Sequence, residues 1–276
     1  MNKLPIAKRT QIIQLLVEGT SLRATPRIAD VSINTVTKLL VDVGAACQQF
    51  HDDTVTNVSS QRVQCDEIWS FVYAKAKNVD EVVAAPEGAG DVWTWTGLDA
   101  DTKLIINWYV GNRDAESALD FMQDVKSRVA NRIQLTTDGH KPYLKAVDTA
   151  FDGEVDFAQL VKIYGSPEGT SNEKRYSSAE FTGTKKVVIE GRPDEKHIST
   201  SFVERQNLTM RMHTRRFTRL TNGFSKKIEN HCHAIALHFV YYNFCKVHKT
   251  LRVTPAMEAK LADRPMSIQQ LVELTD

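Results

Sequence analysis

Three consecutive segments rich in β-branched and aromatic residues constrain the fold of this chain more than any other feature. They read RVQCDEIWSFVYA, VWTWTGLDA and KLIINWYVG, and turn residues separate them. This composition predicts three successive β-strands. A helical pattern capped by Asp114 follows, then a strand at 133–137, a second helix, and a strand at 157–165. Strands followed by strand–helix alternation predict an α/β fold with a mixed sheet.

The first 48 residues have the pattern of a small all-α domain. Apolar residues recur at helical spacing after Ala7 and again after Ser32, and a short helix fits between them. Three helices with a tight turn before the third follow the helix-turn-helix plan, in which the third helix enters the major groove of DNA. The stretch GTSLRATPRIADVSINTVTKLL resembles the helix-turn-helix of transposases and resolvases. Pro26 should disturb the second helix, and a three-helix packing module is the alternative. Asp30 stands where glycine commonly makes the turn, a conformation that Asp tolerates.

The remaining chain divides by composition. The polar stretch 49–61 is expected to be a linker, 62–250 the second domain, and 251–276 a C-terminal tail. Within the second domain, about 165–199 has few large apolar residues and is expected to be an irregular insertion. Two helical segments should follow, one from Ser201 and a longer one at about 228–247.

Charge is unevenly distributed, although the formal net charge is only +1. From Val79 to Asp124, ten acidic residues stand against two basic ones, which gives −8. From Lys196 to Asn230, eight basic residues stand against two acidic ones, which gives +6. The total charge therefore points to neither nucleic acid nor membrane, and any such preference must come from this distribution.

The cysteines indicate neither a disulfide framework nor a zinc ribbon, because the four of them include no CxxC pair. The chain also shows no apolar run typical of a signal peptide or of a membrane span. We therefore expect an intracellular, cytoplasmic protein. Potential metal ligands do cluster on the last long helix, but their spacing matches no zinc pattern and apolar residues interleave them, which favours a core or interface role for His231, Cys232, His233, His238 and Cys245.

Three carboxylates are candidates for chemistry, each with an ordinary alternative. Asp66 lies within an apolar strand, where burial is costly without a partner, a metal or solvent, although a solvated sheet edge would also explain it. Asp138 ends a strand, where sites in open α/β sheets form, but Asp138-Gly139 is also a common turn. Glu204, three residues after Ser201, could simply complete a capping box.

The helix after Glu204 adds a second pattern. Asn207, Arg211 and Arg215 follow at intervals that place all four residues on one helical face. One carboxylate would then point into a site while a basic stripe extends away from it. This arrangement suits a metal at one end and a phosphodiester backbone along the rest, and a solvated basic helix is the alternative.

Three segments together carry a family resemblance. VQCDEIWSFV, LTTDGHKPY and TSFVERQNLTMRMHTRRFTRLTNGFSKK resemble the catalytic core of the DDE transposases of the insertion sequence IS1 family, over Arg62 to Glu258. The closing YYNFCKVHKTLRVTPAM resembles a tail common to transposases and retroviral-type integrases. The resemblance implies a ribonuclease H-like mixed sheet with flanking helices. It also implies a DNA transposase that acts in a prokaryotic cell, at the nucleoid.

Carried over to this sequence, the catalytic and metal-binding triad is Asp66, Asp138 and Glu204, with Glu67 competing for the first position. The family chemistry implies two Mg²⁺ ions, for which Mn²⁺ may substitute, because carboxylates suit hard divalent cations. The implied partners are terminal inverted repeats, target DNA, and further copies of the chain in a homodimer or higher oligomer. A catalytically silent DNA-binding regulator and a ribonuclease H-like nuclease without joining activity are the alternatives.

DNA contacts are expected from two regions, because the cysteine zinc finger common at the N-terminus of this family has no counterpart here. In the helix-turn-helix, the expected contacts are Arg23, Arg27, Asn34, Thr35 and Lys38. In the C-terminal helices, they are Asn207, Arg211, Arg215, Arg216, Arg219, Lys226 and Lys227.

Overall fold

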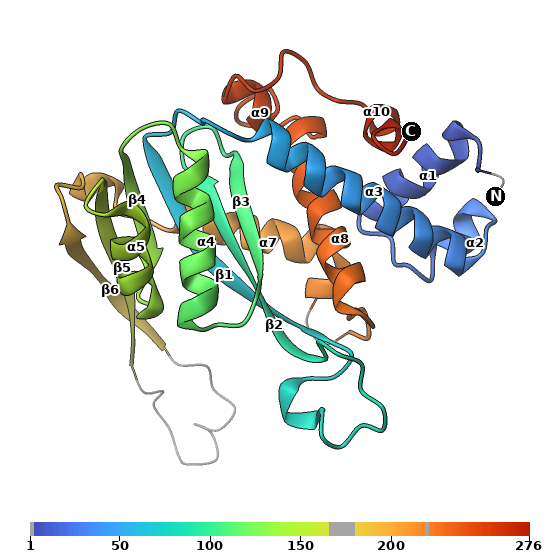
Figure 1. Cartoon of the computed structure of the whole chain (residues 1–276), viewed down its shortest axis with the longest axis horizontal. Helices are drawn as coiled ribbons and strands as arrows, with labels where there is room; N and C mark the ends of the chain where they lie inside the picture. The colour runs from blue at the N-terminus through green and yellow to red at the C-terminus, as the bar shows by residue number, and fades with distance from the viewer. Residues whose placement is uncertain (1–2, 166–179, 219–220) are drawn as a thin grey trace.

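A six-stranded mixed sheet in the order β3-β2-β1-β4-β5-β6 forms the centre of the computed structural model, which describes residues 3–165, 180–218 and 221–276 (Figure 1). Strand β1 pairs antiparallel with β2 and parallel with β4, β4 pairs parallel with β5, and β2–β3 and β5–β6 are antiparallel. The strands are β1 (Arg62–Val72), β2 (Gly90–Asp99), β3 (Ile105–Gly111), β4 (Ile133–Asp138), β5 (Val155–Gly165) and β6 (Glu180–Glu190). The predicted mixed α/β sheet with flanking helices is confirmed.

Helices cover both faces of the sheet, with α4 and α5 in front and α7 behind in Figure 1. They are α1 (Ile6–Val17), α2 (Thr25–Ala29), α3 (Ile33–Thr54), α4 (Ala115–Arg128), α5 (Pro142–Phe151), α7 (Ser201–His213), α8 (Ile228–Val240), α9 (Pro255–Glu258) and α10 (Ile268–Glu273). Shorter 3-10 turns lie at Ala76–Asn78, Glu195–His197 and Arg215–Phe217, and a π-helical turn at Tyr241–Cys245. Among the described helices, none combines the length and apolarity needed to cross a membrane.

Alternation along β1 divides the core between the two faces of the sheet. Cys65 belongs to the buried cluster that contains Phe121 of α4 and Tyr143 of α5. Ile68, on the opposite face, packs in a second buried cluster with Val203 of α7. The predicted cap of α4 is present, because the Asp114 carboxylate accepts a hydrogen bond from the backbone N–H of Ser117 at 2.9 Å.

The insertion expected at about 165–199 is not irregular throughout, because residues 180–190 form β6 and pair with β5. The misleading feature was the scarcity of large apolar side chains in EFTGTKKVVIE. An edge strand makes hydrogen bonds along one side only and tolerates lysines such as Lys185 and Lys186. Residues 166–179 of the predicted insertion lie outside the described residues.

The three N-terminal helices form as predicted, but the third is longer than expected. Asp30 adopts the left-handed conformation (φ 50°) that ends α2, and Ser32 caps α3. Pro26 lies in the first turn of the five-residue α2, where proline is tolerated.

Helix α3 continues to Thr54, so residues 49–54 of the predicted linker are helical. Amide–carboxylate pairs four residues apart, such as Gln48 with Asp52 at 2.9 Å, support this polar helix end. Asp52 also binds Arg128 of α4 at 2.6 Å, and Phe50 packs against Phe244 with ring centroids 4.9 Å apart. The helix therefore connects the N-terminal unit directly to the core of the sheet.

Asn243 joins the π-helical turn to the edge of the sheet. Its side chain is fully buried, accepts the backbone N–H of Ile105 at 2.9 Å and donates to the carbonyl of Ile105 at 2.8 Å. Leucine at this position would leave the N–H of Ile105 without this acceptor and its carbonyl without this donor. We expect Asn243→Leu to lower the free energy of unfolding in urea by about 2–4 kcal/mol.

The exposed Gln49→Ala serves as the control for this variant and should change stability by less than about 0.5 kcal/mol. Equal stability of Asn243→Leu and the parent protein would show that the two hydrogen bonds to Ile105 contribute nothing.

Candidate active site

Parallel pairing of β1 and β4 brings two of the predicted acidic residues together. The last registered pair is Cys65 with Thr137, and Asp66 and Asp138 follow it directly on the two strands. One carboxylate oxygen from each of Asp66, Glu67 and Asp138 lies within 4.8 Å of the others. Such a group of oxygen ligands can hold a divalent cation.

Glu204 of α7 lines the same pocket as Asp66 and Asp138, so the predicted triad converges on one cavity of 690 Å³. Its carboxylate lies 2.8 Å from Nζ of Lys162 on β5 and accepts a hydrogen bond from the Thr200 hydroxyl at 2.5 Å. In this arrangement the Glu204 carboxylate faces a lysine. The three carboxylates that lie within 4.8 Å of one another are those of Asp66, Glu67 and Asp138.

A side chain of β1 determines where α7 begins. The Gln64 side-chain oxygen accepts the backbone N–H groups of Phe202 at 2.9 Å and Val203 at 3.2 Å. These are N–H groups that a helix start leaves without an intrahelical partner. The alternative explanation of Glu204, a capping box with Ser201, is therefore wrong, because Ser201 is already the first helical residue.

Asp66 is the most perturbed carboxyl group of the site. Burial, together with the negative charges of Glu67 and Asp138, raises the pKa of Asp66 to about 7. The side-chain amide of Asn207 donates a hydrogen bond to Asp66 Oδ2 at 2.8 Å. This amide is neutral, so it orients the carboxylate without supplying the positive charge that would offset its burial.

Glu67, the competing candidate, is buried with both carboxylate oxygens engaged. Arg113 Nε donates to one oxygen at 2.6 Å and the Tyr143 hydroxyl donates to the other at 3.1 Å. Arg113 also stacks over the Trp93 ring at 4.7 Å, and its Nη2 lies 3.7 Å from Asp138. Glu67 therefore holds Arg113 beside the acidic cluster.

Arg113 and Lys162 are components of the pocket that the sequence reasoning missed. Arg113 is one of only two basic residues in the acidic stretch from Val79 to Asp124, which is a signal that could have drawn attention to it. Lys162 carried no comparable signal, because a lysine near the end of a strand is ordinary.

The expected DNA-binding residues of the helix-turn-helix lie on the surface of α3 and of the segment before it. Arg23, Arg27, Asn34 and Lys38 are exposed, and Thr35 is half-buried. Lys38 pairs with Asp42 at 2.5 Å, and Arg27 donates to the carbonyl of Arg23 at 2.6 Å.

The predicted basic stripe after Glu204 is only partly present. Helix α7 ends at His213, so Arg215 lies in the following turn, where its Nε donates to the carbonyl of Gly19 at 3.3 Å. Asn207 contacts Asp66 instead of facing outward, and Arg211, half-buried, remains on α7. The prediction that these four residues share one helical face is therefore wrong at Arg215.

The other predicted DNA contacts lie in the connection between α7 and α8. Arg216 is half-buried and donates to the Ser225 hydroxyl at 2.7 Å. Lys226 lies over the ring of Phe224 at 4.3 Å, and Lys227 is exposed. Arg219 lies outside the described residues.

Two of the three histidines of α8, His231 and His238, are buried, as expected of core residues, and His233 is half-buried. His231 is fully buried between the hydroxyls of Ser70, at 3.1 Å, and Ser225, at 2.9 Å. Burial and the nearby Arg216 lower the pKa of His231 to about 3. His231 is therefore a neutral hydrogen-bonding residue at physiological pH.

Comparisons with known proteins find similarity only among solved structures. No protein-family model matches the sequence, and no curated protein matches it either. The chain is similar to the piggyBac transposase in a synaptic complex with hairpin DNA, at 11% identity and a TM-score of 0.46, over 98% of this chain and 69% of that one.

Two structures of the Mos1 transposase are also similar. The paired-end complex with the left transposon end has 12% identity and a TM-score of 0.24, over 57% of this chain and 60% of that one. The strand transfer complex has 12% identity and a TM-score of 0.25, over 86% of this chain and 78% of that one.

The pKa of Asp66 makes a prediction about stability. The folded state binds this proton more tightly than the unfolded chain, where the pKa is 3.8, so the charged carboxylate destabilises the fold increasingly from about pH 4 to pH 7. In metal-free buffer, Asp66→Asn should therefore stabilise the protein by up to about 4 kcal/mol at pH 8 and by little near pH 4, as measured by urea unfolding.

Asp148→Asn removes an exposed carboxylate from α5 and serves as the matched control, with less than about 0.5 kcal/mol expected at either pH. A gain for Asp66→Asn that is equal at both pH values would contradict the prediction.

Proposed function

We propose that this protein is a DNA transposase that binds the terminal inverted repeats of its insertion sequence and catalyses metal-dependent strand cleavage and strand transfer. The observation that carries the proposal is the convergence of Asp66, Asp138 and Glu204 on one pocket. They come from the two central strands, β1 and β4, and from α7, which packs against β1, although the three elements are far apart in the sequence.

The donor set fits magnesium. All three side chains offer carboxylate oxygens, which are the ligands that Mg²⁺ prefers, and the raised pKa of Asp66 reflects burial and nearby negative charge, both of which a bound cation would offset. Asp66, Asp138 and Glu204 would hold two Mg²⁺ ions, or Mn²⁺ in their place, and these ions would supply activation of the attacking oxygen and stabilisation of the leaving oxygen of a phosphodiester. Because Asp66 must lose its proton to serve as a ligand, metal affinity should increase as pH rises through about 7.

The other residues of the pocket bind and orient. Asn207 holds the Asp66 carboxylate through its amide, 2.8 Å away. Arg113 and Lys162 line the same cavity and supply positive charge toward a phosphodiester. The scissile phosphate would therefore lie between these two cations and the carboxylates.

DNA binding is proposed to use the exposed N-terminal part of α3 and the basic connection between α7 and α8. The contacts would come from Asn34, Thr35 and Lys38 on the first, and from Arg216, Lys226 and Lys227 on the second. The protein would act as a homodimer or higher oligomer on paired ends, as an IS1-family enzyme, in the cytoplasm of a prokaryotic cell.

The triad can be tested by conservative substitution. Asp66→Asn, Asp138→Asn and Glu204→Gln each replace an anionic ligand with a neutral one of similar shape, so each should reduce cleavage and joining below detection while DNA affinity stays within about threefold. The assay uses a supercoiled donor plasmid carrying the DNA that flanks the gene, with Mg²⁺ or Mn²⁺. Mn²⁺ binding is followed by electron paramagnetic resonance.

Glu116→Gln, on the exposed surface of α4, is the control and should retain full activity. Joining by any triad variant would remove that residue from the site. Cleavage without joining by the parent protein would favour a nuclease, and binding without cleavage would favour a silent regulator.

Sequence readout by α3 makes a separate prediction. Replacing Asn34, Thr35 and Lys38 together by alanine should weaken binding to the terminal DNA at least tenfold more than binding to random DNA, because residues near the start of a recognition helix face base edges. Fluorescence anisotropy with both duplexes measures the difference. Gln49→Ala, near the other end of α3, is the control. Equal losses on both duplexes would support the packing-module alternative.

A further inference from the structure

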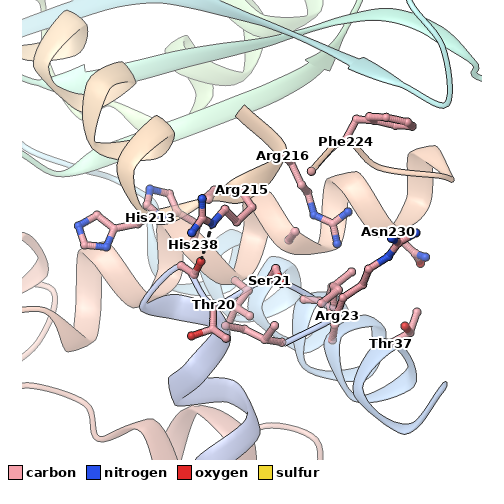
Figure 2. Close-up of a pocket in the computed structure, with 18 of the residues that line it drawn as sticks. Thr20, Ser21, Arg23, Thr37, His213, Arg215, Arg216, Phe224, Asn230 and His238 are labelled. Carbon is pink, nitrogen blue, oxygen red and sulfur yellow. Dashed lines mark hydrogen bonds between the residues drawn. The ribbon is translucent and has the colours of Figure 1, made fainter. Parts of the chain in front are cut away.

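A second pocket, of 320 Å³, lies between the N-terminal helices and the connection that follows α7 (Figure 2). One wall comes from the α1–α2 connection, including Thr20, Ser21 and Arg23, and from Thr37 of α3. The facing wall comes from the segment after α7 and from α8. This pocket shares no lining residue with the acidic cavity.

The pocket is strongly cationic. Arg23, Arg215, Arg216 and Lys226 all line it, and no aspartate or glutamate is among its described lining residues. Within the described part of the chain, none of the four forms an ion pair with a carboxylate within 4.0 Å. Four positive charges around one cavity without a counter-ion attract an anion.

Arg216 is the most enclosed of the four cations, because it is half-buried whereas Arg23, Arg215 and Lys226 are exposed. Burial alone lowers the pKa of its guanidinium to about 10, so it stays charged at neutral pH. The Ser225 hydroxyl accepts from one of its nitrogens at 2.7 Å, but a hydroxyl carries no charge. A buried cation is costly unless an anion pairs with it.

A buried polar atom on the same lining has no partner. His238 is only 5% exposed, and its Nε2 makes no hydrogen bond within the described structure. Burial, His213 and Lys246 lower the pKa of His238 to about 3, so the ring is neutral and one of its nitrogens can accept a hydrogen bond. The pocket thus combines cationic donors with a neutral polar group.

The remaining lining distinguishes the pocket from a simple phosphate site. Apolar side chains of three helices close its inner part, namely Leu16, Val17, Leu40, Ala234 and Leu237. Asn230, which lies close to Arg23 and Arg216 in Figure 2, can hydrogen-bond a planar polar edge. An apolar inner wall, an amide and a cationic rim suit a flat heterocycle that carries a phosphate, and the volume is that of a small-ligand site.

We propose that this pocket binds one nucleotide, with the phosphate at Arg23 and Arg216 and the base against the apolar wall. The nucleotide can be a free nucleoside phosphate or a nucleotide splayed out of a DNA strand. The splayed DNA nucleotide rests on the proposed function. A nucleotide of the bound DNA could reach the pocket, because Ile33 and Thr37, at the start of the proposed recognition helix, line it.

Two titrations of the full chain in EDTA test the proposal without any cleavage. The first measures dAMP binding by isothermal titration calorimetry. The second measures the fluorescence of a single-stranded oligonucleotide that contains 2-aminopurine, with dAMP as competitor. Arg23→Gln, on the surface, and Arg216→Gln, which keeps a donor for Ser225, should each weaken nucleotide binding tenfold or more.

Arg192→Gln and Lys145→Gln are the matched controls, because both residues are exposed, neither lines the pocket and neither is a proposed DNA contact. If dAMP binds more tightly than the oligonucleotide and its binding depends on Arg23, the ligand is a free nucleotide. If the oligonucleotide binds more tightly than dAMP, depends on Arg23 and is displaced by dAMP, the ligand is a nucleotide splayed out of a DNA strand.

The proposal is overturned if neither probe binds, or if the pocket and control variants weaken binding equally. Asp66→Asn should bind both probes like the parent protein. A failure of the metal-dependent cleavage test would therefore leave the outcome of these titrations unchanged, and the two proposals fail independently.

Discussion

The burial of Asp66 in the central strand is the constraint on which the candidate site depends. Each neighbouring carboxylate has a cation beside it: Glu67 has Arg113 at 2.6 Å, Glu204 has Lys162 at 2.8 Å, and Asp138 has Arg113 at 3.7 Å. Asp66, in the described structure, has no cation within 4.0 Å and accepts hydrogen bonds from neutral groups, the amide of Asn207 and the backbone of Glu67. The four carboxylates thus share two cations, Arg113 and Lys162, and a divalent ion would offset the negative charge that remains.

The pattern of elements could be predicted because burial in a central sheet leaves strong local signals. Strands β1 to β5 and helices α4 and α5 stand where β-branched runs, helical spacing and the Asp114 cap placed them. Strand β6 was not predicted, because an edge strand needs no buried face and so lacks the apolar pattern of a central strand. The end of α3 escaped because polar pairs four residues apart, such as Gln48 with Asp52, stabilise a helix whose sequence otherwise suits a linker.

The candidate site was predictable only in part, because its support comes from residues that have ordinary local contexts. Spacing placed Asn207 on the same face as Glu204, but only the packing of α7 against β1 turns its amide to Asp66. The end of α7 depends on tertiary contact, so helical spacing projected Arg215 onto a face that does not extend that far. Lys162 approaches Glu204 because β5 lies beside β4 in the sheet, a relation that no local pattern contains.

Helix α7 ties the acidic site to the N-terminal unit by contacts at both of its ends. At its start, Gln64 of β1 accepts the first free N–H groups and so positions Glu204. At its end, Gly19 (φ 83°) approaches so closely that an added Cβ would lie 3.2 Å from the carbonyl oxygen of His213. Arg215 then donates to the carbonyl of Gly19. The α1–α2 connection, which lines the cationic pocket, therefore packs against the end of the same helix whose first turn carries Glu204.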